Sequence, residues 1–385
     1  MEKIHFRMAI LQKVVPAYRI ALFESLSTSD NMVVRLFIGS DIPDSKVRSA
    51  SSLNSLDVYK LPTSFFNLGR KRLLINHRTL IACLLEFNPD VILCEGESNI
   101  ISYLKAVWYR ILKPKTALVH WSLGSLPGAY PESALRRGIK RRLLSMFDTF
   151  VVYSSYGKDK LVELGCPHDQ IHVAVNVSDT RRHIDAARNL ILTKEEARQE
   201  LGLPMAFTVL YAGTLDDDKS LDKLFTAFTK LSAPRYALVL LGDGPLRAEL
   251  ETKASELGLR YAFFPGQVSW ETMAKFYRAA DVFVLPGRGG MVISEAMAHG
   301  LPVIVYQADG TEIDLVRDGV TGYRIESDSP EAICAALKKL SESPSEAASM
   351  GIAGQLAVEK NYTLDNMAQR IQAAAMQAIK QRRVS

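Results

Sequence analysis

Short apolar runs alternate with helix-forming segments along the whole chain, and this alternation restricts the fold more than any other feature. The first half offers seven strand candidates and the second half six. In order, they are Phe6–Leu11, Val33–Ile38, Val58–Leu61, Val91–Cys94, Ala117–Trp121, Thr149–Val152, Ile171–Val175, Phe207–Ala212, Ala237–Leu241, Tyr261–Phe264, Val282–Leu285, Pro302–Val305 and Gly322–Arg324. Strands that alternate with helices form parallel sheets covered on both faces. The sequence therefore predicts an α/β protein with Rossmann-like, doubly wound sheets.

The length of 385 residues is natural for two such domains. A polar turn, NVSDT, follows the last strand candidate of the first half, so we expect domains at residues 1–177 and 178–363. Helices are expected between the strands, for example over Leu74–Glu86 and Ser133–Ser145. The tail, residues 364–385, has a helical pattern that is long and amphipathic, and we expect it to cross back to the first domain.

Composition narrows the class of protein. Hydrophobic residues make up 48% and charged residues 23%, which is typical of a globular protein. No window of about 18 uncharged apolar residues would span a membrane. The N-terminal run MEKIHFRMAILQ carries charges, so we interpret it as a strand and not a signal peptide, and expect a cytoplasmic protein. The four cysteines (Cys83, Cys94, Cys166 and Cys334) lack metal-ligand spacing and are expected to be buried free thiols.

A cluster of basic residues stands out against the modest net charge of +5. The cluster consists of Arg136, Arg137, Lys140, Arg141 and Arg142. The apolar residues Leu143, Leu144, Met146 and Phe147 follow it. A basic amphipathic helix can lie on an anionic membrane, which makes peripheral attachment to the inner face of the cytoplasmic membrane our interpretation. The alternative is an ordinary solvated helix face. Nucleic acid is not expected as a partner, because stacking aromatics do not alternate with the basic residues.

The segment Val284–Ile304 predicts a strand, a glycine turn, a helix and another strand. Gly287, Gly289 and Gly290 form the turn, and Glu295 lies in the first two turns of the helix. The first N–H groups of a helix lack partners and the helix dipole is positive there, so this place suits an anionic ligand. A carboxylate at Glu295 could accept hydrogen bonds from sugar hydroxyls. The alternative is a tight packing turn with a surface glutamate.

Three other loops follow strand candidates of the second half, where ligands of open parallel sheets bind. The first, GTLDDDKSL, contains Gly213, Thr214 and Lys219, and its lysine could hold a phosphate oxygen. A solvated lysine beside three aspartates is the alternative. The second, GDGPL, begins with Gly242 and only weakly matches a dinucleotide fingerprint. The third contains Gln267 and could border a nucleobase or be a purely structural turn.

Taken together, these loops resemble the donor-binding domain of the retaining glycosyltransferases of family 4, also called group 1. The matching pieces occur in family order: YAGTLDDDKSLDKLFTAF, LLGDGPLRAELE, FFPGQVSWETMAKFYRAADVFVLPG, GMVISEAMAHGLPVIV and RDGVTGYRI. In the first half, VVPAYRIALFESL resembles the opening of members that build polysaccharides and lipopolysaccharides. The resemblance implies the GT-B fold, in which two Rossmann-like domains face each other across a cleft.

The resemblance also implies roles for individual residues. Lys219 matches the lysine that binds the donor diphosphate, and Glu295 matches the glutamate that holds the ribose. The other donor-binding positions are Gly213, Thr214, Gly242, Gln267, Arg288, Gly289, Gly290, Met291 and Val292, and the amides of Gly290 and Met291 approach the sugar and phosphates. Two positions depart from the family. Thr214 replaces an arginine, whose charge Arg288 is expected to supply, and Gly287 replaces a first glutamate.

In the first half, the expected site residues follow strand candidates. His120 is similar to a family histidine near the transferred sugar, although a packed, hydrogen-bonded histidine is the alternative. Glu95 and Glu97 could bind acceptor hydroxyls or act as a base. Tyr18 and Arg19 follow the first strand and are expected to contact the acceptor, or, for Arg19, the donor across the cleft. The predicted catalytic residues are thus His120, Lys219 and Glu295.

The activity that the resemblance implies is hexosyltransferase-type transfer with retention of anomeric configuration, during assembly of cell-surface polysaccharide. The donor would be a nucleotide-diphosphate sugar and the acceptor a hydroxyl of a glycan or lipid-linked glycan. No cofactor or metal is expected, because the acidic run Asp216–Asp218 lies in a turn and no Asp-x-Asp pair ends a strand. Two alternatives remain: a nucleotide-sugar 2-epimerase of the same fold, and a non-catalytic subunit that binds a sugar nucleotide.

Overall fold

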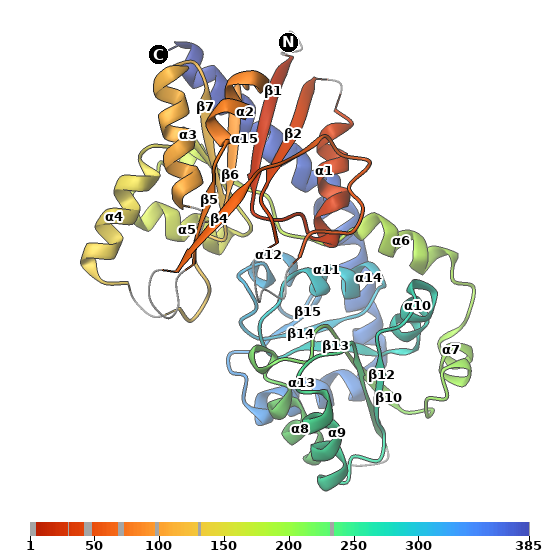
Figure 1. The fold of residues 1–385 in the computed structure, drawn as a ribbon. Helices are drawn as coiled ribbons and strands as arrows, with labels where there is room; N and C mark the ends of the chain where they lie inside the picture. The colour runs from red at the N-terminus through yellow and green to blue at the C-terminus, as the bar shows by residue number, and fades with distance from the viewer. Residues whose placement is uncertain are drawn as a thin grey trace. The chain divides into compact units, whose positions relative to one another are not determined.

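The structure is a computed structural model that describes residues 5–29, 31–41, 48–67, 73–96, 100–129, 132–231 and 235–384. The chain forms two compact units (Figure 1): residues 1–175 together with 364–385, and residues 176–363. Each unit has one parallel sheet with helices around it. The α/β class with doubly wound parallel sheets is therefore confirmed.

The first unit contains a seven-stranded parallel sheet in the order β3-β2-β1-β6-β7-β8-β9. Its strands are β1 (Phe6–Gln12), β2 (Met32–Ile38), β3 (Val58–Lys60), β6 (Val91–Glu95), β7 (Ala117–Ser122), β8 (Thr149–Val152) and β9 (Ile171–Val173). Its helices are the 3₁₀ turn η1 (Ala17–Arg19), α1 (Ile20–Ser27), α2 (Leu80–Phe87), α3 (Ile100–Leu112), α4 (Ala134–Leu144), α5 (Ser155–Glu163), η2 (His168–Gln170) and α15 (Leu364–Val384). Burial on both faces explains why these strands are apolar without clear alternation.

Both faces of this sheet are covered by core clusters. Alternate residues of β1 face opposite sides: Met8 and Ile10 pack with α1 and α15, whereas Ala9 and Leu11 pack with α2 and α3. The C-terminal helix α15 is part of this unit through its buried alanine and isoleucine face. Its backbone also accepts a hydrogen bond, from the Thr149 hydroxyl to the carbonyl of Ala374 at 3.0 Å.

One sequence-based expectation for this unit was wrong. The predicted helix Leu74–Glu86 begins six residues late, because its first residues form the strand β5 (Leu73–His77). That strand pairs antiparallel with β4 (Thr63–Asn67), so that Ile75 lies opposite Phe65. Cross-strand pairing of β-branched and aromatic residues stabilises such a hairpin, and this contact between distant segments is invisible to a local helix pattern.

The second unit contains a six-stranded parallel sheet in the order β12-β11-β10-β13-β14-β15. Its strands are β10 (Phe207–Ala212), β11 (Tyr236–Leu241), β12 (Ala262–Gly266), β13 (Val282–Leu285), β14 (Val303–Val305) and β15 (Gly322–Arg324). Its helices are α6 (Thr180–Asn189), α7 (Lys194–Glu200), the 3₁₀ turn η3 (Asp217–Lys219), α8 (Leu221–Thr229), α9 (Arg247–Glu256), α10 (Trp270–Ala279), α11 (Met291–Ala298), α12 (Glu312–Leu315), α13 (Pro330–Glu342) and α14 (Pro344–Asn361).

The order of these strands brings the loops of interest together. Strands β10 and β13 are neighbours, so the loops that follow them start side by side at the carboxyl edge of the sheet. The loop after β11 also touches the loop after β10: Gly242 has φ +133°, and a Cβ there would collide with the carbonyl oxygen of Gly213. Only glycine fits this close approach, which locks the two loops to each other.

No helix in the described ranges is long and apolar enough to cross a bilayer.

Candidate functional site

The ammonium group of Lys219 lies on the glycine turn after β13. Its Nζ donates a hydrogen bond to the carbonyl oxygen of Arg288 at 2.7 Å and lies 3.1 Å from Oδ1 of Asp218. The Arg288 amide in turn donates to the carbonyl oxygen of Asp218 at 2.8 Å. Two of these contacts tie η3 to the turn, and the lysine side chain is held in place with 17% of its surface exposed. A positive charge is preorganised beside the N-terminus of α11.

Helix α11 begins at this turn. Gly290 is the N-cap of this helix and has no side chain to cap it. Its backbone carbonyl accepts a hydrogen bond from the Ile293 amide at 3.0 Å. A Cβ on Gly290 would collide with the side chains of Asp309 and Thr311. Thr311 is itself oriented by Asp309, to whose Oδ1 its hydroxyl donates at 2.5 Å. The N–H groups of Met291 and Val292 are at the start of the helix, where no earlier carbonyl is in register, so they can receive an anion.

Glu295 lies in the second turn of the same helix, within a polar cluster that the sequence did not reveal. Its Oε2 accepts a hydrogen bond from the hydroxyl of Tyr277 at 3.2 Å and lies 3.8 Å from Nε2 of His183. The other nitrogen of His183 lies 3.2 Å from Nε2 of His299. Burial raises the pKa of Glu295 to about 7, although its hydrogen bonds from Tyr277 and Ser178 oppose the shift. The cluster orients the carboxylate, of which 19% remains exposed.

The remaining donor-binding candidates occupy the same edge of the sheet. Gly213 and Thr214 follow β10, and the carbonyl of Thr214 accepts from the hydroxyl of Tyr211 at 2.8 Å. Gln267 is exposed directly after β12. Arg288 has an exposed side chain, and its contacts with Lys219 and Asp218 are made by its backbone carbonyl and amide. Gly289 follows with φ +133°, and a Cβ there would lie 3.8 Å from Nζ of Lys219.

The structure encloses Gly287 tightly, at the position where the family resemblance implies a glutamate. Gly287 is buried, and a Cβ built on it would lie 2.6 Å from Cα of Lys219 and collide with the carbonyl oxygen of Asp218. Those atoms belong to the backbone and cannot rotate away. The close approach of the turn to η3 therefore leaves no room for any side chain at this position.

Replacing Gly287 by alanine should destabilise the second unit by about 3 kcal/mol, because the added methyl group overpacks against backbone. The midpoint of thermal unfolding should fall by about 2–4 °C for each kcal/mol. Gly287→Glu should behave no better and should not raise activity. The matched control is Gly138→Ala in α4, where a Cβ meets nothing within 4 Å and a gain of about 0.5–1 kcal/mol is expected. A Gly287→Glu variant with the parental midpoint would contradict this account.

The first unit has its own cavity, of about 670 Å³, at the carboxyl ends of β1, β6 and β7. Tyr18, Arg19 and Glu95 line it. Arg19 is buried at 5% exposure, and its Nη2 donates to the hydroxyl of Tyr153 at 2.8 Å. That hydroxyl donates onward to Oε1 of Glu95 at 3.1 Å. The guanidinium also lies over the ring of Trp121, 5.0 Å from its centre, where the aromatic face attracts the cation.

Among the residues of this cavity that sequence analysis did not identify as site residues are Lys13, Trp121, Lys140 and Tyr153. Lys13 and Tyr153 directly follow strands, so the rule that selected Glu95 could have found them. Burial lowers the pKa of Lys13, against the nearby Glu95 carboxylate, which raises it. Lys140 comes from α4, where no local signal links it to the sheet. Glu97, the other expected acid, lies outside the described residues.

His120 requires a correction. Its side chain is 1% exposed and does not line the cavity. It points to the opposite face of β7 from Trp121, among the rings of Tyr103, Phe147 and Phe150. Neither ring nitrogen has a hydrogen-bond partner, and burial lowers its pKa to about 3. A residue in this environment cannot contact a sugar, so the alternative of a packed histidine holds, but the hydrogen bond expected with it is not formed.

The basic helix also requires a correction. The sequence suggested that the apolar residues after Arg142 would face a membrane, but Leu144 and Phe147 are buried in the core at 2% and 6% exposure. Leu143 and Met146 pack against the same core cluster. The exposed apolar residues of α4 are instead Leu135 and Ile139. The basic side chains from Arg136 to Arg142 remain on the outer surface, apart from the partly buried Lys140.

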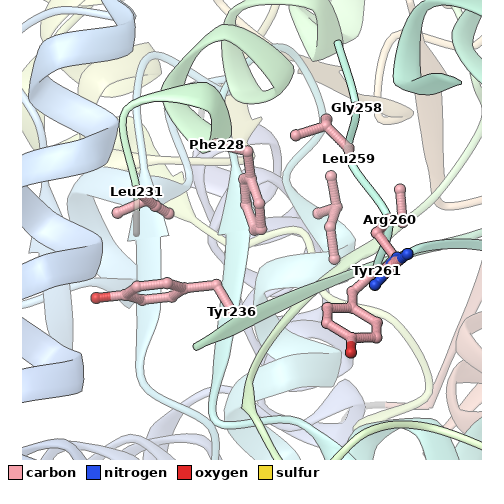
Figure 2. A pocket seen from close by; sticks show the side chains of 9 residues that line it. Phe228, Leu231, Tyr236, Gly258, Leu259, Arg260 and Tyr261 are labelled. Atoms are coloured by element: carbon pink, nitrogen blue, oxygen red, sulfur yellow. The ribbon is translucent and has the colours of Figure 1, made fainter. Parts of the chain in front are cut away.

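Another cavity, of about 360 Å³, lies in the second unit and is lined by Phe228, Tyr236, Arg260 and Tyr261 (Figure 2). Tyr236 begins β11, whereas Gly242 follows the end of that strand. Six residues of strand span about 20 Å, so this cavity is at the far end of the sheet from Lys219. It is therefore separate from the glycine turn and is not a donor site.

Comparison with curated proteins identified relatives of known activity. The GDP-mannose-dependent alpha-(1-6)-phosphatidylinositol monomannoside mannosyltransferase of Mycolicibacterium smegmatis is 31% identical over 192 residues, which are 46% of this chain and 49% of the relative. The GDP-mannose-dependent alpha-mannosyltransferase of Mycobacterium tuberculosis is 27% identical over 74% of each chain. The chain spans about half the length of several such relatives, for example 54% of a D-inositol 3-phosphate glycosyltransferase of Thermomonospora curvata.

Among solved structures, Anabaena HepE in complex with UDP is similar to this chain with a TM-score of 0.73 at 18% identity, over 96% of this chain and 99% of that one. This likeness shows that the chain has the GT-B fold. Two family models match consecutive parts of the sequence, Glycosyltransferase Family 4 over residues 34–182 and Glycosyl transferases group 1 over residues 193–357. Because the two matches together extend over most of its length, the chain belongs to the group 1 glycosyltransferases of family 4.

Proposed function

We propose that this protein transfers a sugar from a nucleotide-diphosphate donor to a hydroxyl group of a glycan or lipid-linked glycan. The observation that carries the proposal is the contact between Lys219 and the glycine turn at the N-terminus of α11. This contact sets an ammonium group, helix amides and the Glu295 carboxylate at one edge of the second sheet. An ammonium and free amides suit a diphosphate, and a carboxylate suits ribose hydroxyls.

The chemistry follows from where charge develops. The bond between the anomeric carbon and the diphosphate breaks, and the acceptor oxygen forms the new bond to that carbon. The proton of the acceptor hydroxyl leaves with the departing phosphate oxygen. Negative charge accumulates on the diphosphate, where Lys219 and the amides of α11 are already oriented. Attack from the face that the diphosphate leaves would retain the anomeric configuration, as the family resemblance implies.

The cavity of the first unit is the proposed acceptor site. Its aromatic side chains, including Tyr18 at 46% exposure, can stack on a sugar ring, and Glu95 can accept hydrogen bonds from hydroxyls. The chain Arg19–Tyr153–Glu95 orients that carboxylate. Burial raises the pKa of Tyr153 well above its usual value, so its hydroxyl stays a donor.

The first test is thermal unfolding against a panel of UDP-, GDP-, ADP- and dTDP-sugars that includes GDP-mannose and UDP-glucose. A ligand that binds only the folded state at one hundred times its dissociation constant adds about 2.7 kcal/mol, which should raise the midpoint by several degrees for one base. The same assay in EDTA should give the same shift, because we propose that donor binding and transfer need no metal. A shift that disappears in EDTA and returns with a divalent cation would contradict metal independence.

Product analysis completes the test. Incubation with the selected donor and a glycan acceptor should yield a glycoside with the anomeric configuration of the donor, measured by NMR. Conversion of the donor alone into an altered nucleotide sugar would identify an epimerase instead. Binding of the donor without turnover on any acceptor would favour a non-catalytic subunit, which the replaced family glutamate at Gly287 makes a specific alternative.

We also propose that the protein acts in the cytoplasm, on the inner face of the cytoplasmic membrane, in the assembly of cell-surface polysaccharide. The support is the outer surface of α4, where four arginines are exposed without an acidic neighbour in the helix. Such a surface is attracted to anionic lipid headgroups. It would hold the enzyme near a lipid-linked acceptor.

A further inference from the structure

Helix α3 presents a row of large apolar side chains to solvent. Leu104, Trp108 and Ile111 are 50%, 53% and 70% exposed, and Leu112 at the end of the helix is 47% exposed. The spacing of four and three residues places the first three on one side of the helix. Globular proteins scatter single exposed apolar residues, but a row with an exposed tryptophan indicates an interaction surface.

The position of α3 in the core explains why this row is exposed. Its inner side carries Ser102, Tyr103, Ala106 and Tyr109, all at most 1% exposed. Tyr103 packs on Phe147, just after α4, with ring centres 5.4 Å apart. The helix is therefore anchored to the sheet on one side, and its other side points outward (Figure 1). Packing alone requires only the inner side to be apolar.

The charges around this row favour one kind of partner. Neither the 13 residues of α3 nor the 11 residues of α4 include an aspartate or glutamate. Two exposed lysines, Lys113 and Lys115, follow the end of the row directly. An apolar strip with a tryptophan, on a helix without acidic residues and followed by two lysines, matches the interface of an anionic bilayer.

We propose that α3 inserts Leu104, Trp108 and Ile111 into the interface of an anionic membrane, while Lys113, Lys115 and the arginines of α4 contact the headgroups. This inference deepens the proposed membrane attachment and assigns its apolar part to a different helix. The basic helix α4 supplies charge, but its own apolar side is buried in the core. Insertion of a tryptophan and two aliphatic side chains supplies the hydrophobic component that electrostatic attraction lacks.

A second copy of the chain is the competing occupant of this surface. A self-complementary contact would bring the cations of α3 and α4 close to their own symmetry mates. Since neither α3 nor α4 offers a carboxylate, the cations of these two helices would repel each other in that contact. The charge pattern thus favours lipid.

The experiment uses vesicles of equal parts phosphatidylglycerol and phosphatidylcholine, with pure phosphatidylcholine vesicles as comparison. The chain has three tryptophans, of which Trp121 is fully buried. On binding anionic vesicles, Trp108 should shift its emission to shorter wavelength and become quenched by brominated lipid chains. Trp108→Phe should abolish most of this change, since the remaining tryptophans stay away from lipid.

Cosedimentation with the same vesicles tests the energetic role. Trp108→Ser combined with Ile111→Ser should weaken binding by about tenfold or more, because each side chain loses its transfer to an apolar medium. The matched control is Ile352→Ser combined with Leu356→Ser in α14, whose side chains are 60% and 59% exposed on a helix that carries acidic residues. The control should bind vesicles like the parent.

Three results would overturn the inference. The first is no spectral change of Trp108 on anionic vesicles, and the second is equal binding to vesicles of pure phosphatidylcholine. The third is a parent protein that is a dimer in solution and becomes a monomer when Trp108 is replaced. None of these measurements depends on sugar transfer. Activity on a water-soluble acceptor should be the same in the serine variant and the parent, so a failure of membrane insertion is distinguishable from a failure of the proposed function.

Discussion

Replacing Lys219 by alanine should lower kcat/KM for sugar transfer by about 10²–10³-fold, the usual cost of removing one preorganised group that stabilises developing negative charge. Lys219 is the ammonium held at the glycine turn, with its Nζ 2.7 Å from the Arg288 carbonyl. Arginine at 219 should restore only part of the activity, because its longer, planar group cannot occupy the same hydrogen-bond position. Initial rates with the donor selected by thermal shift provide the measurement.

The matched control is Lys275→Ala. Lys275 belongs to the same unit, and its side chain forms a surface ion pair with Glu200 of α7 at 2.6 Å. Its loss should change neither kcat/KM nor the donor-induced thermal shift. If Lys219→Ala retains more than about a third of the parental kcat/KM, well outside the range expected for an oriented cation, the site assignment fails. The fold should survive, because the substitution removes one partly exposed side chain and leaves the turn intact.

Replacing His120 by leucine should stabilise the first unit and leave sugar transfer intact. The two unpartnered ring nitrogens of His120 are buried, and removing such groups recovers about 1–3 kcal/mol of desolvation free energy. The midpoint of thermal unfolding should rise by about 2–4 °C for each kcal/mol. Were His120 to contact the transferred sugar, activity would instead fall steeply, so the two interpretations give opposite results.

The stability that His120→Leu gains over the parent should increase as the pH is lowered. The pKa of His120 is about 3 in the folded protein, against about 6.5 when unfolded. Between these values the unfolded chain binds a proton that the folded chain excludes, so stability is complete above pH 6.5 and is lost as the pH falls toward 3. The loss is about 1.4 kcal/mol per pH unit, or about 2 kcal/mol at pH 5. Unfolding midpoints measured from pH 8 to pH 5 should therefore decline less in His120→Leu than in the parent.

Other titratable groups contribute to the same dependence of stability on pH. Burial lowers the pKa of His77 to about 4, of His183 to about 3 and of His299 to about 4, and each adds a loss of the same sign. The raised pKa of Glu295, about 7, acts in the opposite direction, because the folded protein keeps that proton longer than the unfolded chain. The control for the His120 variant is His168→Leu, which changes an exposed side chain. An equal effect of both substitutions would contradict the role assigned to burial.

Much of the candidate donor site followed from local sequence. Strand ends, glycine turns and helix starts are decided by neighbouring residues, so Lys219, Gly290 and Glu295 were all assigned to loops or helices at the carboxyl edge. Their meeting depended on a further fact, that β10 and β13 are adjacent in the sheet. The polar cluster of His183, Tyr277 and His299 around Glu295 joins three helices and has no local signature.

His120 shows where local reasoning fails. In a strand, successive side chains point to opposite faces, so His120 and Trp121 had to diverge. Both faces of the first sheet are buried, and the run ALVHWS is therefore nearly all apolar and does not show which residue turns toward a cavity. Only the packing of α3 and Phe147 on one face settled it. The same limit applies to α4, because a helical apolar pattern does not distinguish a core contact from a membrane contact.

The order of strands, helices and turns, and with it the α/β class and the loops that could bind a ligand, was determined by the sequence itself, because short-range patterns of apolar residues and glycines control it. The tertiary structure alone decided which loops touch, which face of β7 carries the histidine, and which helix leaves apolar side chains in solvent. Those outcomes depend on pairing and packing between segments that are far apart in the chain, and no local pattern records them.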